Sequence, residues 1–377
     1  MKLLILQEKL KEGLRIVSRA ATKSISLPIL NNVFLGTEQS FLNLSATDLE
    51  IGIKFWALAK IEKEGKLAVP SQALSSFVNL LPNKKTEIEV KDLILNIECE
   101  NYKTQLNGFL AEEFPIIPQV SDGEIVSVDG QEFCKGLNQV VSIASSSTTR
   151  PEISGVYLIF GKNEIKMVAT DSFRLGEKTF FVKNPTELKQ QYSLILPQKT
   201  AKEVINIFGE EKEELRIHLT PNQILFERLM PEVASSPQIH LVSRLIEGEY
   251  PNYKEIIPEE SKTQAIFDKE EFLNQIKTAS IFSGKINEVK IQVNPEEKRV
   301  EIKSKSSDLG EYDSFFPAKI KGEAITVSFN HKFLTEGLQN IKSSQISLEL
   351  DGEDGPGVLR PVGDESYLYI VMPIKAD

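Results

Sequence analysis

Cysteine and histidine are scarce in this chain of 377 residues, which has two cysteines, Cys99 and Cys134, and three histidines. Two isolated cysteines cannot form a disulfide framework or a four-thiolate zinc site, so we expect both to be small buried hydrophobic residues. No two of His218, His240 and His331 have a spacing suited to one metal ion. His218 alternates with apolar neighbours, and we expect it to face solvent from a strand. The sequence therefore predicts no metal site.

Long apolar runs are missing as well. The first six residues contain four consecutive apolar side chains, and charged residues follow at once. This is too short for the apolar stretch of a signal peptide. No later run approaches the roughly 20 apolar residues that a membrane-spanning helix needs. We therefore expect a cytoplasmic protein with no membrane partner.

Positive charge is in the minority, because 44 lysines and arginines face 54 acidic residues and the formal net charge is −10. This balance excludes a protein that coats itself with nucleic acid through a generally basic surface. A local basic face remains open. Residues 7–21 have the spacing of a helix, with an apolar stripe on one side and Lys11, Arg15 and Arg19 on the other.

One block of sequence occurs three times along the chain. Each copy has a turn at an aspartate, at Asp48, Asp171 and more weakly Asp308, which stand 123 and 137 residues apart. A helix start follows each turn after 22 to 26 residues, at 69–71, 196–198 and 329–331. Each block closes on an apolar residue and a proline, at 114–115, 250–251 and 372–373. A repeat of this size indicates how the chain is built from similar domains. The residues of a catalytic centre, in contrast, usually occur only once in a chain.

Length and repeat agree on three domains of about 125 residues each. Short polar connectors near 120–127 and 258–263 place these domains at residues 1–122, 127–258 and 259–377. In each block, two segments with helical stripes alternate with segments of period two, which are typical of half-buried antiparallel strands. Asp129 with Glu132, and Asp268 with Glu271, predict helix caps at the start of the second and third blocks. We predict an α+β fold with two helices per domain packed on antiparallel sheets.

The repeated aspartates are the first residues to consider for catalysis, and their repetition favours a structural role. Asp side chains cap their own backbone in such bends, so we interpret Asp48 and Asp308 as turn residues. Asp171 differs through its neighbours Phe173 and Arg174. An enzyme that uses Asp171, Arg174 and a nearby carboxylate is one alternative function. A monomeric protein-binding scaffold is another.

Six motifs occur in order between residue 1 and about residue 375. They are residues 27–32 (LPILNN), 46–50 (ATDLE), 114–115 (FP), 169–175 (ATDSFRL), 248–253 (GEYPNY) and 369–374 (YIVMPI). This ordered set resembles the bacterial β sliding clamp family, the processivity subunit (subunit beta) of DNA polymerase III. Each motif is weak alone, and the set with its domain-sized spacing is specific.

The resemblance implies that the chain is three tandem clamp domains, half of a pseudo-sixfold ring. In that family two protomers join head to tail around duplex DNA and tether the replicative DNA polymerase and other DNA-processing proteins. The implied protein is not an enzyme, needs no cofactor and does not read DNA sequence. Its implied partners are double-stranded DNA, a second copy of itself, replicative polymerase subunits and a separate ATP-driven clamp loader.

Basic residues near the hole of such a ring would face phosphates, where contacts are non-specific and salt-sensitive. The DNA-facing residues implied by the resemblance are Lys11, Arg15, Arg19, Lys23 and Arg150. The family often has an arginine at the position of Ser24, which has Lys23 beside it here. Arg150 is retained in a loop without tyrosines, and a solvated loop cation is an equally good interpretation of it.

Closure of a ring requires two exposed strand edges that prefer each other. By resemblance, the strand at residues 102–107 supplies one edge with Thr104 and Leu106. Leu106 would meet Ile281 and Phe282 of the third domain. The alternative is that Ile281 and Phe282 end a core helix.

The resemblance also implies a pocket between the second and third domains for a short clamp-binding motif of partner proteins. An apolar cleft suits this task, because a flexible tail must bury a few side chains to offset the cost of its ordering. Arg174 would place a cation at the rim. For Ile153 and Leu175, burial in a domain core is an equally good interpretation. The implied pocket residues are Ile153, Thr170, Phe173, Arg174, Leu175, Pro251, Ile256, Asn330, Phe333, Met372, Pro373 and Ile374.

Two segments depart from the family pattern. Residues 228–238 (RLMPEVASSPQ) look longer than usual and predict a protruding loop. The chain ends on Ala376 and Asp377, where the family commonly ends on an apolar residue. We therefore expect the last pocket contact to differ.

Overall fold

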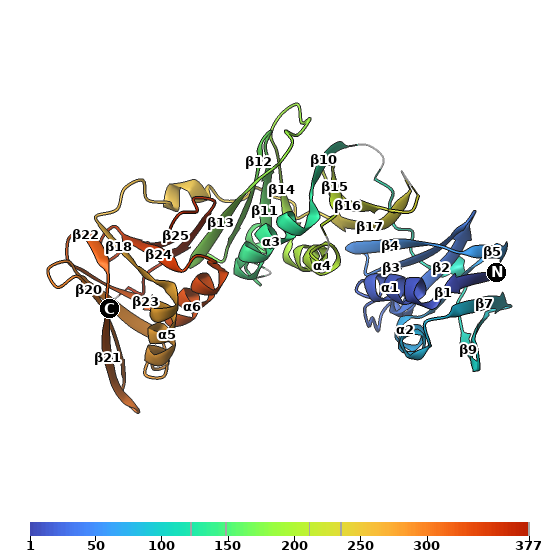
Figure 1. Ribbon diagram of the computed structural model, residues 1–377, viewed down its shortest axis with the longest axis horizontal. Helices are drawn as coiled ribbons and strands as arrows, with labels where there is room; N and C mark the ends of the chain where they lie inside the picture. Colours follow the sequence, from blue (N-terminus) through green and yellow to red (C-terminus); the bar gives the residue numbers. More distant parts are fainter. Residues whose placement is uncertain (121–122, 148, 211, 234–235, 376–377) are drawn as a thin grey trace. The chain divides into compact units, whose positions relative to one another are not determined.

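The computed structural model of the chain describes residues 1–120, 123–147, 149–210, 212–233 and 236–375 (Figure 1). The predicted change at Ala376 and Asp377 lies outside the described residues. The chain divides into two compact units. The first contains Met1–Cys134, Thr186–Lys189 and Lys202–Leu245, and the second contains Lys135–Pro185, Gln190–Ala201 and Ile246–Asp377.

Two α-helices occur in the described part of each block, as the sequence predicts. They are α1 (Gln7–Val17) and α2 (Ser71–Leu80), then α3 (Gly130–Val140) and α4 (Gln198–Phe208), then α5 (Lys269–Ser280) and α6 (His331–Asn340). The second helix of each block begins at the predicted position. The first helix is shorter than the predicted 7–21. After Val17 the chain continues in tighter turns, where Arg19 N–H reaches Ile16 O at 3.4 Å, so Arg19 lies beyond the helix.

The predicted helix caps of the second and third blocks are confirmed. Glu132 N–H donates to Asp129 Oδ1 at 3.1 Å, and Glu271 N–H donates to Asp268 Oδ1 at 2.9 Å. Each carboxylate satisfies a backbone donor that has no partner within its own helix. Short polar side chains at these two positions thus set where α3 and α5 begin.

The strands of the first block are β1 (Lys2–Leu6), β2 (Asn32–Glu38), β3 (Phe41–Thr47), β4 (Ile51–Leu58), β5 (Lys60–Lys63), β6 (Lys66–Pro70), β7 (Lys85–Lys91), β8 (Ile94–Cys99) and β9 (Tyr102–Asn107). Those of the second are β10 (Glu124–Asp129), β11 (Gly155–Phe160), β12 (Glu164–Thr170), β13 (Arg174–Phe181), β14 (Tyr192–Pro197), β15 (Glu214–Leu219), β16 (Gln223–Leu229) and β17 (Pro237–Arg244). Those of the third are β18 (Thr263–Asp268), β19 (Glu288–Asn294), β20 (Arg299–Ser306), β21 (Gly310–Pro317), β22 (Lys319–Gly322), β23 (Ile325–Asn330), β24 (Gln345–Leu350), β25 (Gly357–Pro361) and β26 (Tyr367–Val371).

In the described residues, each unit contains one long and one short antiparallel sheet. The first unit has the order β10-β15-β16-β17-β4-β3-β2-β6 and the order β5-β1-β7-β8-β9. The second has the order β14-β11-β12-β13-β26-β25-β24-β18-β22 and the order β21-β20-β19-β23. Each long sheet joins two blocks through one strand pair, β4 with β17 and β13 with β26. We name these pairs, with the residues around them, the first junction and the second junction.

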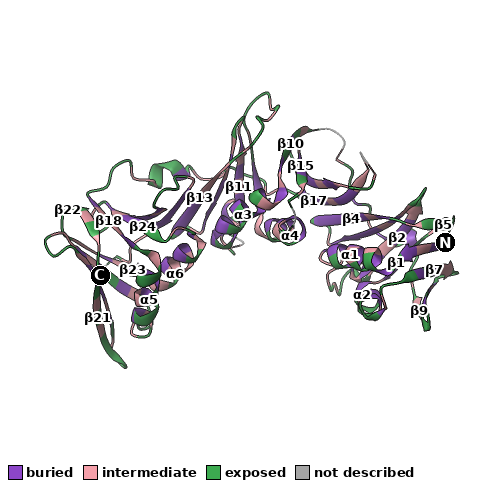
Figure 2. Ribbon diagram, viewed as in Figure 1, coloured by how far each residue is buried: buried purple, intermediate pink, exposed green. Residues whose placement is uncertain are grey.

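The buried faces of the helices lie against the sheets, which confirms the predicted α+β arrangement (Figure 2). On α1, Leu10 and Leu14 are fully or almost fully buried. Gly13 allows α1 to pack closely against β4, because a Cβ at this position would stand 2.5 Å from Phe55 Cδ1 on β4. The opposite side of α1 is left for its charged residues.

Both cysteines are free and buried, as predicted, and burial raises the pKa of Cys134 to about 12. The described residues contain no group of three or more His, Cys, Asp and Glu side chains placed to hold a metal ion. Among the described residues, no helix combines the length and the apolar character that crossing a membrane requires.

The prediction that His218 faces solvent is wrong. Its side chain is 17% exposed, and its Nε2 lies 3.1 Å from Glu227 Oε2. His240 Nε2 lies 2.8 Å from the other oxygen of the same carboxylate. Strands β15, β16 and β17 bring the three side chains onto one face. The Glu227 carboxylate accepts hydrogen bonds from both imidazole rings, and these bonds explain why neither ring points into solvent.

Candidate functional sites

The aspartate turns of the first two blocks have the same hydrogen bonds. Asp48 Oδ1 accepts from the backbone N–H groups two and three residues later at 3.0 and 2.7 Å, and Asp171 Oδ1 does the same at 3.0 and 3.0 Å. The residue after each aspartate has a positive φ, 77° and 78°. Asp308 also lies in a turn, where its Oδ1 accepts from the Ser307 hydroxyl at 3.1 Å. The backbone contacts confirm the predicted turn role of Asp48 and assign the same role to Asp171, and Asp308 lies in a turn as predicted.

The second junction contains an apolar cluster that includes Leu175. Leu175 is fully buried, and Ile153, at the end of the 3₁₀ turn η4 (Pro151–Ile153), is 2% exposed. The cluster joins Leu175 to Val168, Tyr253, Val358, Leu368 and Ile370. Leu175 and Ile153 are thus buried like core residues, and a pocket role for them stays a prediction.

Arg174 does not lie at an exposed rim, contrary to expectation. Its side chain is 9% exposed, and its guanidinium donates to Asp171 Oδ2 at 3.0 Å and to Glu336 on α6. It also lies 4.8 Å from the centre of the Phe333 ring. Burial alone lowers the pKa of Arg174, but Tyr369, Glu336 and Asp171 outweigh burial and raise it. Two carboxylates hold this cation inside, where it connects β13 to α6.

Partly exposed apolar side chains lie near this ion pair, since Phe333 contacts both Arg174 and Phe173. Phe173 is 62% exposed, and its ring stands 6.2 Å from the ring of Phe333. Met372 N–H donates to Phe173 O at 2.8 Å, and Ile374 N–H donates to Ser328 O at 2.8 Å. Met372, Pro373 and Ile374 are half-buried. The structure therefore brings the predicted residues of β13, α6 and the chain end together.

The remaining predicted pocket residues have separate local roles. Thr170 Oγ1 donates to Arg174 O at 2.7 Å within the aspartate turn. Asn330 Oδ1 accepts from Lys332 N–H at 3.0 Å and caps α6. Pro251 is half-buried and Ile256 is 43% exposed on the linker after β17.

Several further residues lie beside these and are not among the predicted site residues. Glu336 holds Arg174, and Tyr250 stacks on Tyr157 with ring centres 4.6 Å apart. Tyr253 lies 5% exposed in the apolar cluster. The Tyr-Pro-Asn-Tyr motif at 250–253 was the available signal for Tyr250 and Tyr253. No local pattern marks Glu336, because its partner is 162 residues away in the chain.

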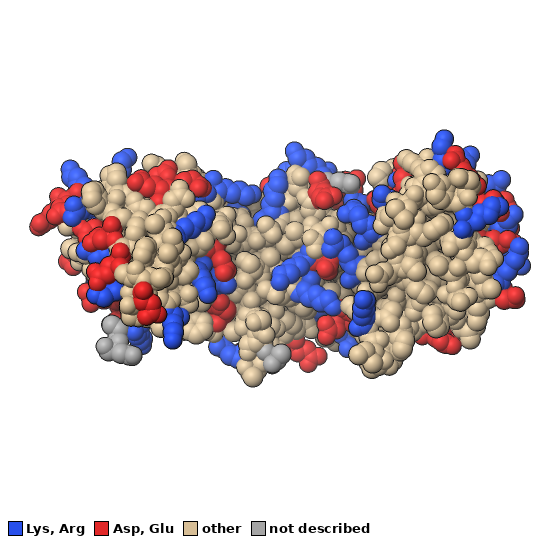
Figure 3. Space-filling view, turned by 90° about the horizontal axis from the view of Figure 1, so that it is seen from below, with Lys and Arg blue, Asp and Glu red and all other residues tan. Residues whose placement is uncertain are grey.

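The predicted DNA-facing residues near α1 differ in their surroundings. Lys11, Arg15 and Lys23 are exposed, whereas Arg19 is half-buried. Arg19 Nη1 donates to Glu203 Oε2 on α4 at 3.0 Å. Figure 3 shows several groups of lysine and arginine side chains on the face seen from below, with acidic side chains among them. The chain thus presents basic groups locally despite its net negative charge.

Arg150 is exposed and lies beside the turn at Asp171. Its Nε donates to Glu152 Oε1 at 3.1 Å, and its Nη1 donates to Ser172 Oγ at 2.9 Å. These contacts fit a loop cation and leave its positive charge at the surface. A role for Arg150 toward DNA stays a prediction.

The described part of residues 228–238 contacts α1 through Arg228 and Glu232, while Pro231 and Glu232 are exposed. Arg228 is 7% exposed, with Nε 3.2 Å from Glu213 Oε2 and Nη2 3.6 Å from Glu12 Oε1. Lys9 Nζ lies 3.3 Å from Glu232 Oε1. Opposite charges on the segment and on α1 account for this packing. Residues 234–235 lie outside the described residues.

Each short sheet has two terminal strands, β5 and β9 in one and β21 and β23 in the other. β9 is the last strand of the five-stranded sheet, and β21 is the last strand of the four-stranded sheet. On β9, Thr104 lies opposite Ile97 and Leu106 lies opposite Leu95, so both predicted interface residues share the face of the buried β8 residues. They are half-buried. The predicted strand at 102–107 is confirmed.

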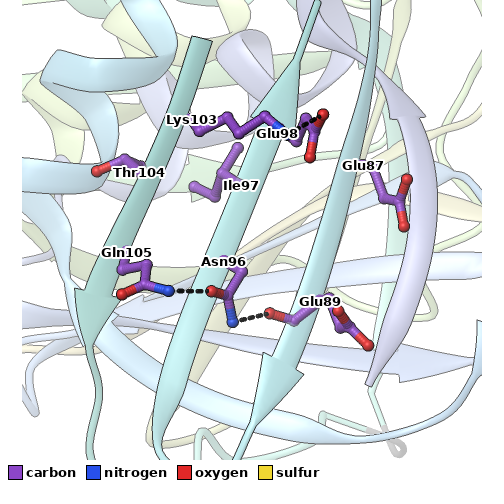
Figure 4. Close-up of a pocket in the computed structure, with 8 residues that line it drawn as sticks. All are labelled: Glu87, Glu89, Asn96, Ile97, Glu98, Lys103, Thr104 and Gln105. Carbon is purple, nitrogen blue, oxygen red and sulfur yellow. Dashed lines mark hydrogen bonds and ion pairs between the residues drawn. The ribbon is translucent and has the colours of Figure 1, made fainter. Parts of the chain in front are cut away.

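The other face of this sheet edge is polar (Figure 4). A hollow of about 410 Å³ lies over β7, β8 and β9. Across it, Gln105 Nε2 donates to Asn96 Oδ1 at 2.9 Å, and Lys103 Nζ lies 2.7 Å from Glu98 Oε1. These cross-strand pairs fix the direction of side chains next to the edge.

Ile281 and Phe282 follow α5 and are not both core residues. Ile281 is 61% exposed, whereas the buried stripe of α5 ends at Ala279. Phe282 is half-buried and stacks on Tyr312 of β21, with ring centres 6.1 Å apart. An apolar side chain that the helix does not bury favours the interface interpretation over the core interpretation.

Three sequence models of one family match consecutive parts of the chain. The N-terminal domain of the DNA polymerase III beta subunit matches residues 1–118, the central domain 127–252 and the C-terminal domain 254–375. The chain is also similar to proteins named beta sliding clamp. That of Bacillus subtilis (strain 168) is 27% identical over 387 residues, covering 100% of both chains. That of Synechococcus elongatus is 28% identical, covering 100% of this chain and 99% of the other.

Solved structures agree with these matches. The DNA polymerase sliding clamp of Bacillus subtilis superposes with a TM-score of 0.92 at 27% identity, over 100% of both chains. The DNA polymerase III beta subunit of Thermotoga maritima superposes with a TM-score of 0.90 at 26% identity, again over 100% of both. With the three family domains matched in order and the fold shared over its full length, this chain belongs to the DNA polymerase III beta subunit family, the bacterial sliding clamps.

Proposed function

We propose that two copies of this chain join head to tail into a closed ring that encircles duplex DNA and slides along it. The ring tethers the replicative DNA polymerase and other DNA-processing proteins and so gives them processivity. The observation that supports this proposal most is the match of three clamp domains, in order, to nearly the whole chain. Each copy supplies half of a pseudo-sixfold ring, with domains at 1–122, 127–258 and 259–377.

The DNA is held by phosphate contacts and not by base readout. Lys11, Arg15 and Lys23 are exposed cations that suit this role, and Arg150 adds a fourth from its loop. Such contacts carry no sequence information and weaken as salt rises. Retention then comes from the closed ring, which slides because no single contact is strong.

The ring closes where β9 of one copy meets β21 of the other. Both are terminal strands of antiparallel sheets, so their outer backbone groups are available for a further strand. Leu106 and Thr104 on β9 then lie near Ile281 and Phe282. Two different surface patches meet at this contact. Such a head-to-tail contact gives a closed ring only if the rotation that relates one copy to the next leads back to the first copy.

Partner proteins bind at the second junction through a short flexible motif. Phe173, Ile256, Met372, Pro373 and Ile374 offer partly exposed apolar surface for its side chains. The buried Arg174 and the apolar cluster beneath keep this surface in a fixed shape. A few well-packed apolar contacts offset the entropy that the motif loses on ordering.

The clamp performs no chemistry of its own and uses no cofactor, and it works in the cytoplasm. Asp171 and Arg174, the residues that an enzyme alternative requires, bind each other and the backbone of their own turn. Opening of the ring is left to a separate ATP-driven clamp loader.

Retention on circular DNA tests the ring directly. Labelled protein is loaded onto nicked circular DNA, isolated by gel filtration, and the DNA is then cut once with a restriction enzyme. We expect the protein to stay on the circle and to leave the linear product. Equal retention on both forms would contradict topological linkage.

Sedimentation separates the ring from a monomeric scaffold. A ring of two chains has twice the mass of one chain, which is 42.3 kDa. We expect the two-chain mass at micromolar concentration. A single-chain mass under those conditions would rule out the closed ring.

A further inference from the structure

The two junctions are built on the same strand frame. β4 pairs with β17 and places Gly52 opposite Val242, and β13 pairs with β26 and places Leu175 opposite Ile370. Both β4 and β13 begin after the same aspartate turn. Gly52 and Leu175 therefore hold equivalent positions, and the first junction repeats the frame on which we place the peptide site.

The linkers that cross the two junctions differ in length. The first linker reads FPIIP at residues 114–118, and the second reads YPNYKEIIP at residues 250–258. The second therefore has four additional residues, 252–255, between the same two motifs. These residues form most of the 3₁₀ turn η5 (Tyr253–Ile256), whose last residue, Ile256, is 43% exposed. Ile257, which follows the turn, is half-buried.

The short linker places Ile117 directly on the first junction. Ile117 is 6% exposed and packs with Leu225 and Val242. A Cβ on Gly52 would stand 2.5 Å from Ile117 Cγ2 and 3.2 Å from Ile117 Cγ1. A leucine at position 52, like Leu175 at the second junction, would therefore collide with Ile117. The glycine and the short linker are complementary to each other.

Ile117 is also held by its backbone. Lys54 Nζ donates to Ile117 O at 3.4 Å, and burial lowers the pKa of Lys54. The hollow that remains beside Ile117 measures about 250 Å³ and is bounded by Thr47, Val242 and Arg244. Ligand pockets usually measure about 300–1,000 Å³, so Ile117 leaves too little room for a peptide.

We propose that Ile117 is a built-in occupant of the first junction, which it closes to the apolar peptide motifs that bind at the second. Each chain thus offers partner proteins one peptide site although its fold repeats the frame of that site. The length of the linker and the residue at position 52 decide which junction is open. This inference rests on the proposed peptide site at the second junction.

The test opens the first junction and counts bound peptides. The probe is a tryptophan-free peptide selected on the wild-type protein by phage display, and Met372→Ala must weaken its binding. The opened variant carries Gly52→Leu and an Asn-Tyr-Lys-Glu insertion between Pro115 and Ile116. Calorimetry gives the number of peptides per chain. The single tryptophan, Trp56 on β4, reports binding at the first junction through its emission.

We expect one peptide per wild-type chain with unchanged Trp56 emission, and two per opened chain with a shift in that emission. A matched control carries the same insertion between Glu296 and Glu297, in the exposed turn between β19 and β20, and should keep one peptide. A folded opened variant that still binds one peptide, or a wild-type chain that already binds two, overturns the inference alone. Failure to obtain any peptide sensitive to Met372→Ala overturns the peptide site and the inference together.

The reciprocal variant decides the question if the opened chain does not fold. It lacks residues 252–255 and carries Leu175→Gly, so its second linker matches the first. We expect it to keep its secondary structure and to lose peptide binding at least tenfold. A folded reciprocal variant that binds the peptide like the wild type overturns the inference.

Discussion

The guanidinium of Arg19 donates to the carboxylate of Glu203 at 3.0 Å, an ion pair that connects the segment after α1 to α4. A cation that already has an anionic partner attracts phosphate less than a free one, because the two opposite charges largely cancel at a distance. Lys11 and Arg15 on α1 are exposed instead. We therefore expect the basic residues of this region to contribute unequally to the proposed DNA binding.

Arg15→Ala should weaken binding to duplex DNA more than Arg19→Ala does. Loss of one phosphate contact reduces the magnitude of the negative slope of log K against log salt by about 0.9. Because Arg19 is already paired, Arg19→Ala should reduce that magnitude by clearly less. Fluorescence anisotropy with labelled duplex DNA over a series of salt concentrations measures both slopes.

Glu203→Gln is the matched control for this comparison. It removes the partner charge and leaves Arg19 in place, so DNA binding at low salt should become tighter. If Arg19→Ala and Arg15→Ala change the slope equally, or if Glu203→Gln has no effect, the ion pair does not govern the role of Arg19.

Phe173→Ala and Met372→Ala should weaken peptide binding by at least tenfold without lowering the stability of the chain. Both side chains are partly exposed, so their truncation leaves no cavity in the core. Leu175→Ala is different, because Leu175 is fully buried and its truncation should cost about 2–5 kcal/mol of folding free energy. Calorimetric titration with a partner peptide and urea unfolding separate the two effects. Unchanged binding by both exposed-site variants would remove the second junction as the peptide site.

The parts of the fold that depend on local sequence were predictable. Helix starts at Ser71 and Gln198, the caps at Asp129 and Asp268, and the turn at Asp48 all follow from side chains that act within a few residues of themselves. The resemblance to a family added the order of the three domains. The resemblance also predicted that residues of β13, α6 and the end of the chain lie close together.

The parts that depend on pairing between distant strands were not predictable. His218 looked like a solvent-facing residue because its partners Glu227 and His240 reach it only through strand register. Arg174 looked like a rim residue because Glu336 is 162 residues away along the chain. In both cases a polar side chain meets its partner only through tertiary structure, and no local pattern of the sequence indicates that contact.

Ile281→Glu should convert the two-chain ring into single chains. Ile281 is 61% exposed, so a glutamate there costs little in the isolated chain but would lose its water on burial between copies. Phe181→Glu is the matched control, since Phe181 is 65% exposed on β13, outside the proposed contact. Analytical ultracentrifugation at micromolar concentration should show one chain for the first variant and two for the second. A dimer that survives Ile281→Glu would place the interface elsewhere.

Glu227 should make stability depend on pH in the acid range. Hydrogen bonds from His218 and His240 lower the pKa of Glu227 from its ordinary value of 4.5, against the effect of its burial. A lowered pKa means that the folded chain stabilises the carboxylate, so this contribution is complete above about pH 4.5 and declines as the pH falls below it. Lys54 lies opposite His240 on β4 and adds a positive charge to the same face of the sheet.

Glu227→Gln should therefore lower the free energy of unfolding at pH 7 by about 1–3 kcal/mol, since two partly buried hydrogen bonds to a charge become bonds to a neutral amide. The difference from wild type should shrink progressively as the pH falls below about 4.5, because the unfolded wild-type chain takes up a proton at Glu227 well before the folded chain does. Urea unfolding at fixed protein concentration measures it, because association between chains shifts apparent stability. Glu214→Gln on β15 is the control: Glu214 is 57% exposed beside Arg216 and should change stability by less than about 0.5 kcal/mol at every pH. A difference between Glu227→Gln and wild type that stays constant from pH 7 to about pH 3 would mean that Glu227 acts through its shape and not through its charge.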